Sequence, residues 1–73
     1  MSAASGRGRV TNTVRKLREA AGWTQAALAE RVGATRQTII AVEAEKYAPS
    51  LELAFRLARA FGLPFEAVFQ FED

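Results

Sequence analysis

A recurring sequence pattern for short capped helices restricts the fold of this chain more than any other feature. In each unit of this pattern a hydroxyl residue precedes a short stretch with apolar residues at helical spacing, and a glycine follows the stretch. Thr24 and Gly33 enclose QAALAERV in this way, and Ser50 and Gly62 enclose LELAFRLARAF. A Ser or Thr hydroxyl accepts a free backbone N–H at a helix start, and glycine readily takes the left-handed conformation that ends a helix. Each unit therefore predicts one short helix.

Related signals predict three more helices. Gly22 closes a helix that begins near Val14, and Thr35 caps a helix over residues 36–44. Pro64, at a favoured first-turn position, opens a short helix at PFEAVF. RVT near the start and FQFED at the end alternate apolar and polar residues, which predicts a short two-stranded ribbon. The expected fold class is all-α with five helices, to which this ribbon is an optional addition.

The stretch TRQTIIAVEAEKY, from Thr35 to Tyr47, allows two interpretations. Its β-branched centre is typical of a buried strand, but no neighbouring stretch of similar length is available to pair with it. A helix instead places Ile39, Val42 and Glu43 on one side. The opposite side then holds Arg36, Gln37, Ile40, Ala41 and Ala44. We therefore predict a helix with one side toward the core and one side free for a partner.

Composition argues against several classes of function. The chain has 73 residues and no Cys or His. The absence of both residue types excludes disulfides and nearly every zinc, haem or iron–sulfur site, so no metal or cofactor is expected. Carboxylate pairs such as Glu72 and Asp73 give no basis for an enzyme without His, Cys or an implied enclosed pocket. No apolar run approaches the roughly 20 residues that span a bilayer, and residues 1–8 are expected to form a flexible polar arm.

Charge is distributed unevenly along the chain. Residues 1–36 contain seven Lys or Arg and two acidic residues, whereas residues 37–73 contain three Lys or Arg and six acidic residues. A basic half joined to an acidic half indicates an anionic partner met by one side, although solvated helix faces would give the same pattern. Arg7 and Arg9 are compatible with contact to a DNA backbone or minor groove, and equally with a merely soluble tail.

Two capped helices separated by Gly33-Ala34 have the layout of a helix-turn-helix, whose second helix enters the DNA major groove. The wider stretch resembles the Cro/phage-repressor (XRE) helix-turn-helix family over about residues 9–71, with matching marks that include TQAALAERVGATRQTI and YAPSLELAFRLARAFG. It is most similar to small stand-alone dimeric regulators of the cytolysin-repressor type. The resemblance implies a five-helix lambda-repressor-like DNA-binding domain over residues 9–73, with N- and C-terminal strands.

The resemblance also implies DNA-contacting residues. Arg36 and Gln37 match the base-reading pair at the start of the second helix. An Arg fork suits the O6/N7 edge of guanine, and Gln suits the N6/N7 edge of adenine. Ile40 and Ala41 stand where relatives often carry polar base readers, so they either meet thymine methyl groups or contact nothing. The positions that match DNA-backbone contacts are Gln25, Thr35, Thr38, Lys46 and Tyr47.

Further residues concern how this helix is held. Arg18 and Glu43 lie on otherwise apolar helix faces and match a largely buried ion pair of the repressors, so we expect them to meet and to act structurally. Gln25 matches a glutamine that also braces the second helix. Glu45 stands where relatives often have Gly or Asn. Because a left-handed Glu would be strained, we expect the turn there to close differently.

Aromatic residues are numerous for so small a chain. Trp23, at the junction of the first two helices, is expected in the core rather than against a base. Five short helices cannot hide all five Phe residues, and four of these lie in the last thirteen positions. We predict a homodimer surface with a closed monomer as the alternative. The residues predicted for this surface are Leu63, Phe65, Phe69 and Phe71.

These patterns predict a sequence-specific transcriptional regulator that binds double-stranded DNA as a homodimeric repressor on a palindromic operator. The expected location is the bacterial cytoplasm, at the nucleoid, with no membrane partner and no small-molecule ligand. Two alternatives remain open: the antitoxin of a toxin–antitoxin pair, and a protein-interaction bundle without DNA binding. A DNA binder should weaken steeply as salt rises, whereas such a bundle has no salt-dependent DNA affinity.

Overall fold

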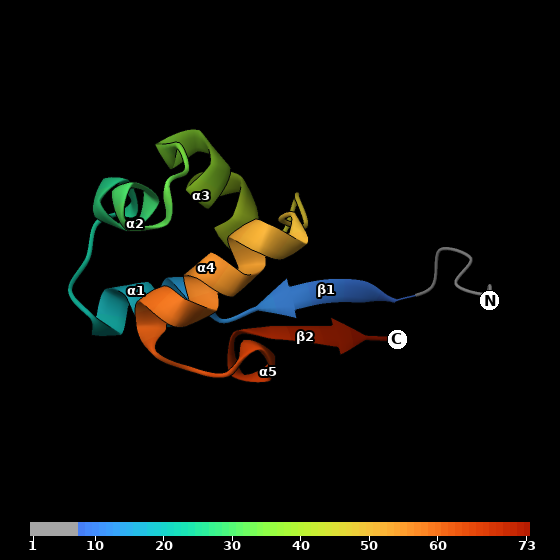
Figure 1. The fold of residues 1–73 in the computed structure, drawn as a ribbon. Helices are drawn as coiled ribbons and strands as arrows, with labels where there is room; N and C mark the ends of the chain where they lie inside the picture. The colour runs from blue at the N-terminus through green and yellow to red at the C-terminus, as the bar shows by residue number, and fades with distance from the viewer. Residues whose placement is uncertain (1–7) are drawn as a thin grey trace.

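The computed structural model describes residues 8–73 and contains five helices and a two-stranded ribbon (Figure 1). Most of the predicted arm, including Arg7, lies outside these residues. The fold confirms the expected five-helix, lambda-repressor-like class and its ribbon. In chain order the elements are β1 (Arg9–Asn12), α1 (Val14–Ala20), α2 (Gln25–Val32), α3 (Arg36–Glu43), α4 (Leu51–Phe61), α5 (Phe65–Val68) and β2 (Phe69–Glu72).

The residues predicted to begin and end the helices act as expected. The hydroxyls of Thr24, Thr35 and Ser50 each accept a hydrogen bond from the amide three residues later, at 3.0, 3.1 and 3.1 Å. Gly33 and Gly62 follow α2 and α4 with φ of 71° and 68°, in the left-handed region where a side chain is disfavoured. Helix ends are thus set by interactions within a few residues of the chain.

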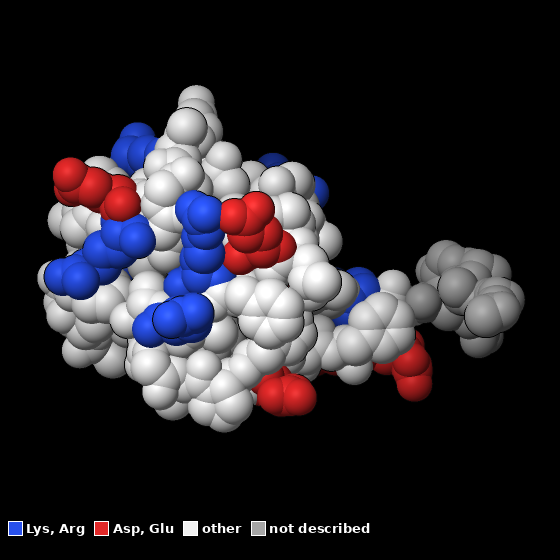
Figure 2. Space-filling view, in the orientation of Figure 1, with Lys and Arg blue, Asp and Glu red and all other residues white. Residues whose placement is uncertain are grey.

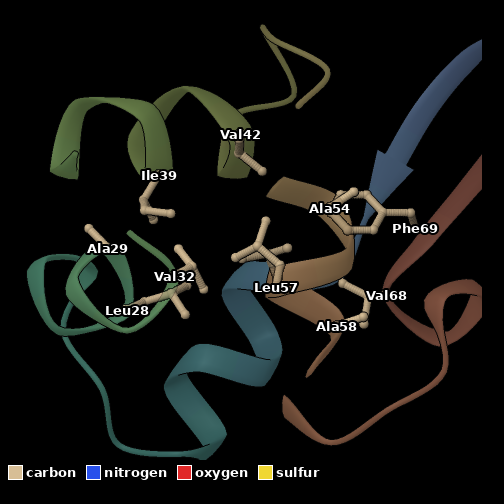
Figure 3. Close-up of a cluster of buried hydrophobic side chains, with 11 residues drawn as sticks. Leu28, Ala29, Val32, Ile39, Val42, Ala54, Leu57, Ala58, Val68 and Phe69 are labelled. Carbon is tan, nitrogen blue, oxygen red and sulfur yellow. The ribbon is translucent and has the colours of Figure 1, made fainter. Parts of the chain in front are cut away.

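The core is assembled around α4, which packs against α1, α2 and α5. Leu57 of α4 is fully buried, and Figure 3 shows it between side chains of α2 and α3 on one side and those of α5 and β2 on the other. Leu28 and Ile39, from α2 and α3, are also fully buried. One continuous apolar cluster therefore holds all five helices and one strand, which is how so short a chain buries a core.

Trp23 lies at the edge of this core. Its ring stacks on Phe61 with centroids 5.5 Å apart, and the guanidinium of Arg31 lies 4.1 Å from its centroid on the ring face. Stacking and cation–π contact suit an aromatic ring that is half-buried rather than sealed in. Trp23 thus packs against the core, as expected, and joins the α1–α2 turn to the end of α4.

The ribbon brings the two ends of the described chain side by side (Figure 1). β1 and β2 pair antiparallel, with Val10 opposite Phe71 and Asn12 opposite Phe69. An isolated two-stranded ribbon is marginal in water, but this one is anchored because Phe69 is buried in the core at 5% exposure. Phe71 also covers Gly8, where a Cβ would come within 2.5 Å of the ring. None of the helices that the structure describes is both long and apolar enough to span a membrane.

Candidate nucleic-acid interface

α2 and α3 form two packed helices joined by a tight turn. Gly33, in the left-handed conformation, ends α2, and α3 begins three residues later. Ile39 and Val42 are fully buried, so α3 turns this side toward the core. The helix reading of the β-branched stretch is confirmed, and its apolar content belongs to the buried side of α3.

The outward side of α3 begins with Arg36 and Gln37, which are both exposed in the first turn. Ile40 and Ala41 follow one turn later and are half-buried. Because residues advance by about 100° along a helix, Gln37 and Ala41 share one side, with Arg36 and Ile40 toward its edge. These four side chains form a mixed polar and apolar strip along the helix. Such a strip offers hydrogen-bonding groups at one end and methyl groups at the other.

The opposite side of α3 is tied to α1 and α2 by a buried ionic cluster. Arg18 Nε donates to Glu43 Oε2 at 2.6 Å and Arg18 Nη2 donates to Glu43 Oε1 at 3.1 Å, a bidentate pair whose side chains are 12% and 5% exposed. Arg18 also donates to the carbonyl of Trp23 at 2.8 Å. Gln25 Nε2 adds a bond of 3.2 Å to Glu43 Oε1. The hydrogen bond and charge of Glu43 raise the pKa of Arg18 above its usual value.

This cluster fixes the orientation of α3. Within the described residues, no buried side-chain nitrogen or oxygen lacks a hydrogen-bond partner. A fully bonded buried network permits few alternative arrangements, because each alternative leaves a charge unpaired in a poorly solvated site. Arg18 and Glu43 therefore meet where we expected, and Gln25 braces α3 through Glu43.

A groove of about 620 Å³ runs along one edge of the outward strip. Arg36 and Ile40 line it from α3, Gln25 from the start of α2, and Arg15 from α1. Arg15 was not among the predicted contact residues, although it lies three positions before Arg18 and so shares that side of α1. It is exposed and pairs with Glu19 at 3.2 Å. An exposed ion pair of this kind is weak, so Arg15 can readily leave Glu19 and bind another anion.

A second groove, of about 320 Å³, runs along the other edge of the strip. Thr35 and Thr38 line it from the start of α3, and their hydroxyl oxygens are 3.0 Å apart. Tyr47 and Ser50 line it from the loop between α3 and α4. The outward strip thus lies between one groove lined by Arg15, Arg36 and Gln25 and another lined by hydroxyl groups. Lys46 is exposed just before Tyr47.

The turn after α3 differs from expectation. We expected it to avoid a left-handed Glu45, yet Glu45 has a φ of 59°. Its carboxylate is held by the side chain of Arg9 and by the backbone N–H of Asn12, the latter at 3.1 Å. These long-range bonds offset the local strain, which sequence neighbours alone do not reveal.

The four residues predicted for a dimer surface have different environments. Phe71 is 64% exposed and Leu63 37%, whereas Phe65 is half-buried. Phe69 is 5% exposed and belongs to the core of the single chain, because β2 enters the molecule at that residue. Its predicted place at an exposed surface is therefore corrected to that of a core residue at the base of a groove.

That groove has a volume of about 680 Å³ and is mostly apolar. Val10, Leu51, Phe65 and Phe71 line it, but Leu63 does not. Leu51, at 66% exposure, was not among the residues predicted for the dimer surface. The ribbon and α4 thus share an open apolar face on which a further protein surface would bury these side chains.

Charged side chains of both signs occur on the surface of the molecule. On the face in Figure 2, which carries α4 toward the viewer, Lys and Arg lie among Asp and Glu over the helices. Opposite charges side by side give no extended field of one sign. The groove that begins at Gln25 is lined by Arg15, Arg18, Arg36 and Glu43, and the hydroxyl-lined groove includes Glu52 and Arg56.

A family model described as helix-turn-helix matches residues 14–68, from the start of α1 to the end of α5. The chain belongs to the helix-turn-helix family. The matched span contains the buried cluster of Arg18, Gln25 and Glu43 and the whole outward strip of α3. The terminal ribbon that packs on this helix-turn-helix core lies outside the match.

Relatives of this helix-turn-helix protein occur in archaea and bacteria. An uncharacterized HTH-type transcriptional regulator of Methanocaldococcus jannaschii is 54% identical over 50 residues, which cover 68% of this chain and 76% of that protein. Another, from Methanothermobacter thermautotrophicus, is 61% identical over 49 residues, which cover 67% of this chain and 71% of that protein. One from Bacillus subtilis is 45% identical over 62 residues, covering 85% of this chain and 94% of that protein.

The fold of this helix-turn-helix protein also has a counterpart among solved structures. The crystal structure of a protein from Bacteroides fragilis, thought to bind DNA, superposes with a TM-score of 0.74. The match covers 84% of this chain and 98% of that chain at 21% sequence identity. This likeness concerns the fold, which is retained although four of five aligned residues differ.

Proposed function

We propose that this protein is a sequence-specific transcriptional regulator that binds double-stranded DNA as a homodimer, and that it acts as a repressor on a palindromic operator. The observation that carries the proposal is the placement of α3. Its outward strip is free, its inward side is locked by the Arg18–Glu43 pair, and a groove runs along each edge of the strip. Rigid presentation of a polar helix face suits the reading of a major groove.

The strip supplies the chemistry of direct base reading. Arg36 has the bidentate donor geometry that fits guanine O6 and N7, and Gln37 carries the donor and acceptor that fit adenine N6 and N7. Ile40 and Ala41 are half-buried, so only part of each side chain is available to a thymine methyl group. We propose Arg36 and Gln37 as the main base readers, with Ile40 and Ala41 as apolar contacts beside them.

The two grooves supply contacts to the phosphate backbone. A major groove is bordered by one phosphate strand on each side, and an inserted helix needs partners for both. On one side Gln25 and Arg15 are available. On the other side Thr35, Thr38 and Tyr47 are available, with Lys46 nearby. Contacts on both sides would fix the depth and direction of α3 without adding sequence preference.

A homodimer would place two such helices on one face of DNA. The apolar groove beside the ribbon supports this part of the proposal, because its exposed Leu51 and Phe71 are costly to leave in water. A two-fold dimer binds half-sites one helical turn apart, about 34 Å. The longest dimension of the part of the chain that the structure describes is 38 Å, so a dimer of two chains can span that distance. The proposed function also locates the protein with the chromosome, in a prokaryotic cytoplasm, as a binding protein rather than an enzyme.

Selection of bound sequences from a random double-stranded DNA pool tests this function. We expect two inverted half-sites whose centres are about 10 base pairs apart. Affinity for the selected sequence should fall steeply with salt, since each neutralised phosphate releases counterions. A pool that returns no enriched motif after several rounds contradicts sequence-specific regulation. A single half-site without inversion contradicts the palindromic dimer but retains the reading role of α3.

A further inference from the structure

The turn that ends α3 contains a strained residue. Among residues 8–73, Glu45 is the one non-glycine residue with positive φ, at 59°. An L side chain in this region is unfavourable and persists where surrounding contacts determine it. The backbone N–H of Glu45 donates to the carbonyl of Val42 at 3.0 Å, and that of Lys46 donates to Ala41 at 3.1 Å. Both bonds close the end of α3, so the left-handed residue sets where the helix stops.

The contacts that hold Glu45 come from β1, more than thirty residues away in the chain. The guanidinium of Arg9 forms an ion pair with the Glu45 carboxylate, whose side chain is 24% exposed. The backbone N–H of Asn12 donates to the second carboxylate oxygen at 3.1 Å. Both oxygens of Glu45 are therefore bound by one strand of the ribbon.

Asn12 forms a second link between the same strand and α3. Its side-chain Nδ2 donates to the carbonyl of Val42 at 2.9 Å, and its Oδ1 accepts from the backbone N–H of Val14 at 3.0 Å. The carbonyl of Val42 is one of the last in α3 and accepts from both Asn12 and Glu45. Asn12 thus joins the start of α1, the end of α3 and the ribbon through one side chain.

The position of this cluster matters for the DNA-facing side. Glu45 directly precedes Lys46 and Tyr47, which we propose to lie near phosphates. A carboxylate at such a place repels the DNA backbone unless it is neutralised. The ion pair with Arg9 provides that neutralisation. Without Arg9, Glu45 would be an electrostatic disadvantage for DNA binding, so the value of this carboxylate lies in its bonds to β1 rather than in its charge.

We propose that Glu45 and Asn12 are positioning residues, which lock the end of α3 and the start of the Lys46–Tyr47 loop to the terminal ribbon. This inference rests on the proposed DNA-binding function. The Arg18–Glu43–Gln25 cluster fixes α3 from α1 and α2, and the Asn12–Glu45 contacts fix its last turn from β1. With both anchors, the direction of α3 in a major groove depends on the ribbon. The ribbon thereby contributes to sequence preference without contacting a base.

The test uses Glu45→Gly in the full chain, with DNA sequences selected by the wild-type protein. Glycine adopts the left-handed turn without strain, which compensates for part of the lost bonding and keeps the chain folded. The same variant also removes a negative charge beside the phosphates. A bystander carboxylate would therefore give tighter binding on removal, whereas a positioning residue gives weaker binding to the selected sequence. The two roles predict opposite signs.

We expect Glu45→Gly to lose roughly tenfold in affinity for the selected sequence, with much less change on a scrambled duplex. Asn12→Ala, which removes the bond to Val42, should lower the same preference. Glu30→Gln serves as the matched charge control, because Glu30 is exposed on α2 and lines none of the three grooves described above. It should leave the ratio of the two affinities unchanged. Thermal unfolding of each variant defines a binding temperature at which all are folded.

Several outcomes overturn the proposal. These are unchanged or tighter binding of Glu45→Gly to the selected sequence, and a parallel loss on selected and scrambled DNA. A wild-type protein that selects no motif defeats the proposed function itself. That failure is recognised before any variant is made, so it is distinguishable from failure of the positioning role.

Discussion

Side chains of α3 divide into two groups with different physical tasks. Ile39 and Val42 are fully buried, and the side chain of Glu43 is 5% exposed. These three residues therefore stabilise the fold through packing and ion pairing. Arg36 and Gln37 are exposed and contribute little to the stability of the single chain. Substitutions in the two groups should therefore separate folding from DNA recognition.

Arg36→Ala tests the reading group. We expect the affinity for the selected operator to fall by about 1–3 kcal/mol, with relaxed preference at one base pair, because a bidentate contact to guanine is lost. Stability should be nearly unchanged. The measurement is the affinity for operators that carry each of the four base pairs at each position. Lys16→Ala is the control, because Lys16 is likewise exposed and lies in the basic segment, residues 1–36. Equal loss on every sequence would instead assign Arg36 to a phosphate.

Glu43→Ala tests the locking group. The substitution leaves the Arg18 guanidinium largely buried at 12% exposure without its bidentate partner, which should lower the free energy of unfolding by about 3–5 kcal/mol. Urea unfolding measures this change. Glu19→Ala removes the partner of Arg15 in an exposed pair and should cost less than about 1 kcal/mol. Similar costs for both variants would show that the buried pair has no special role.

The helix-turn-helix itself depends on a short turn whose conformation is restricted. Gly33 follows α2 with a φ of 71°, and a Cβ there would lie 3.0 Å from an Arg56 guanidinium nitrogen. Gly62 follows α4 with a φ of 68° and open space around it. The two glycines adopt the same backbone conformation, but only Gly33 lies between α2 and α3 and so sets the direction of one relative to the other.

Gly33→Ala and Gly62→Ala form a matched pair at this level. Each should lose about 1–2 kcal/mol of folding stability, since each forces an L side chain into the left-handed region. Gly33→Ala must in addition displace Arg56, which donates to the Val32 carbonyl. Calorimetry measures the stability, and DNA binding is compared at a temperature where both are folded. We expect Gly33→Ala alone to weaken specific binding; equal binding by both variants contradicts a special role of this turn.

At the scale of the whole molecule, the main feature is the exposed apolar groove between α4 and the ribbon. Its exposed side chains, Val10, Leu51 and Phe71, lie on β1, α4 and β2, outside α2 and α3. A dimer formed there would leave the outward strip of both copies free. Because DNA affinity of a palindrome reader depends on two linked half-sites, dimerisation and operator binding should change together.

Leu51→Glu tests this surface. Leu51 lines the groove at 66% exposure and lies in the first turn of α4, where a carboxylate suits the helix dipole, so folding should be retained. We expect a shift from dimer to monomer in sedimentation and at least tenfold weaker binding to a full operator. Leu63→Glu, outside the groove, should have a smaller effect. A wild-type chain that sediments as a monomer at high concentration contradicts the homodimer.

Local features of this protein were predictable from sequence, because the interactions behind them join residues three or four positions apart. The hydroxyl caps at Thr24, Thr35 and Ser50 are of this kind, and so are the glycines that end the helices. The side of α3 that faces inward also follows from helical spacing. The meeting of Arg18 with Glu43 needed one further premise, that two charges on apolar faces must neutralise each other.

Other features were decided by the tertiary structure, because their partners are distant in the chain. Phe69 was expected at a surface, yet the pairing of β2 with β1 turns it into the core. Glu45 was expected to avoid the left-handed region, yet Arg9 and Asn12 hold it there. Local propensity sets only the cost of such a conformation. Whether the cost is met depends on which groups the fold brings within hydrogen-bond reach, and that is a property of the folded chain.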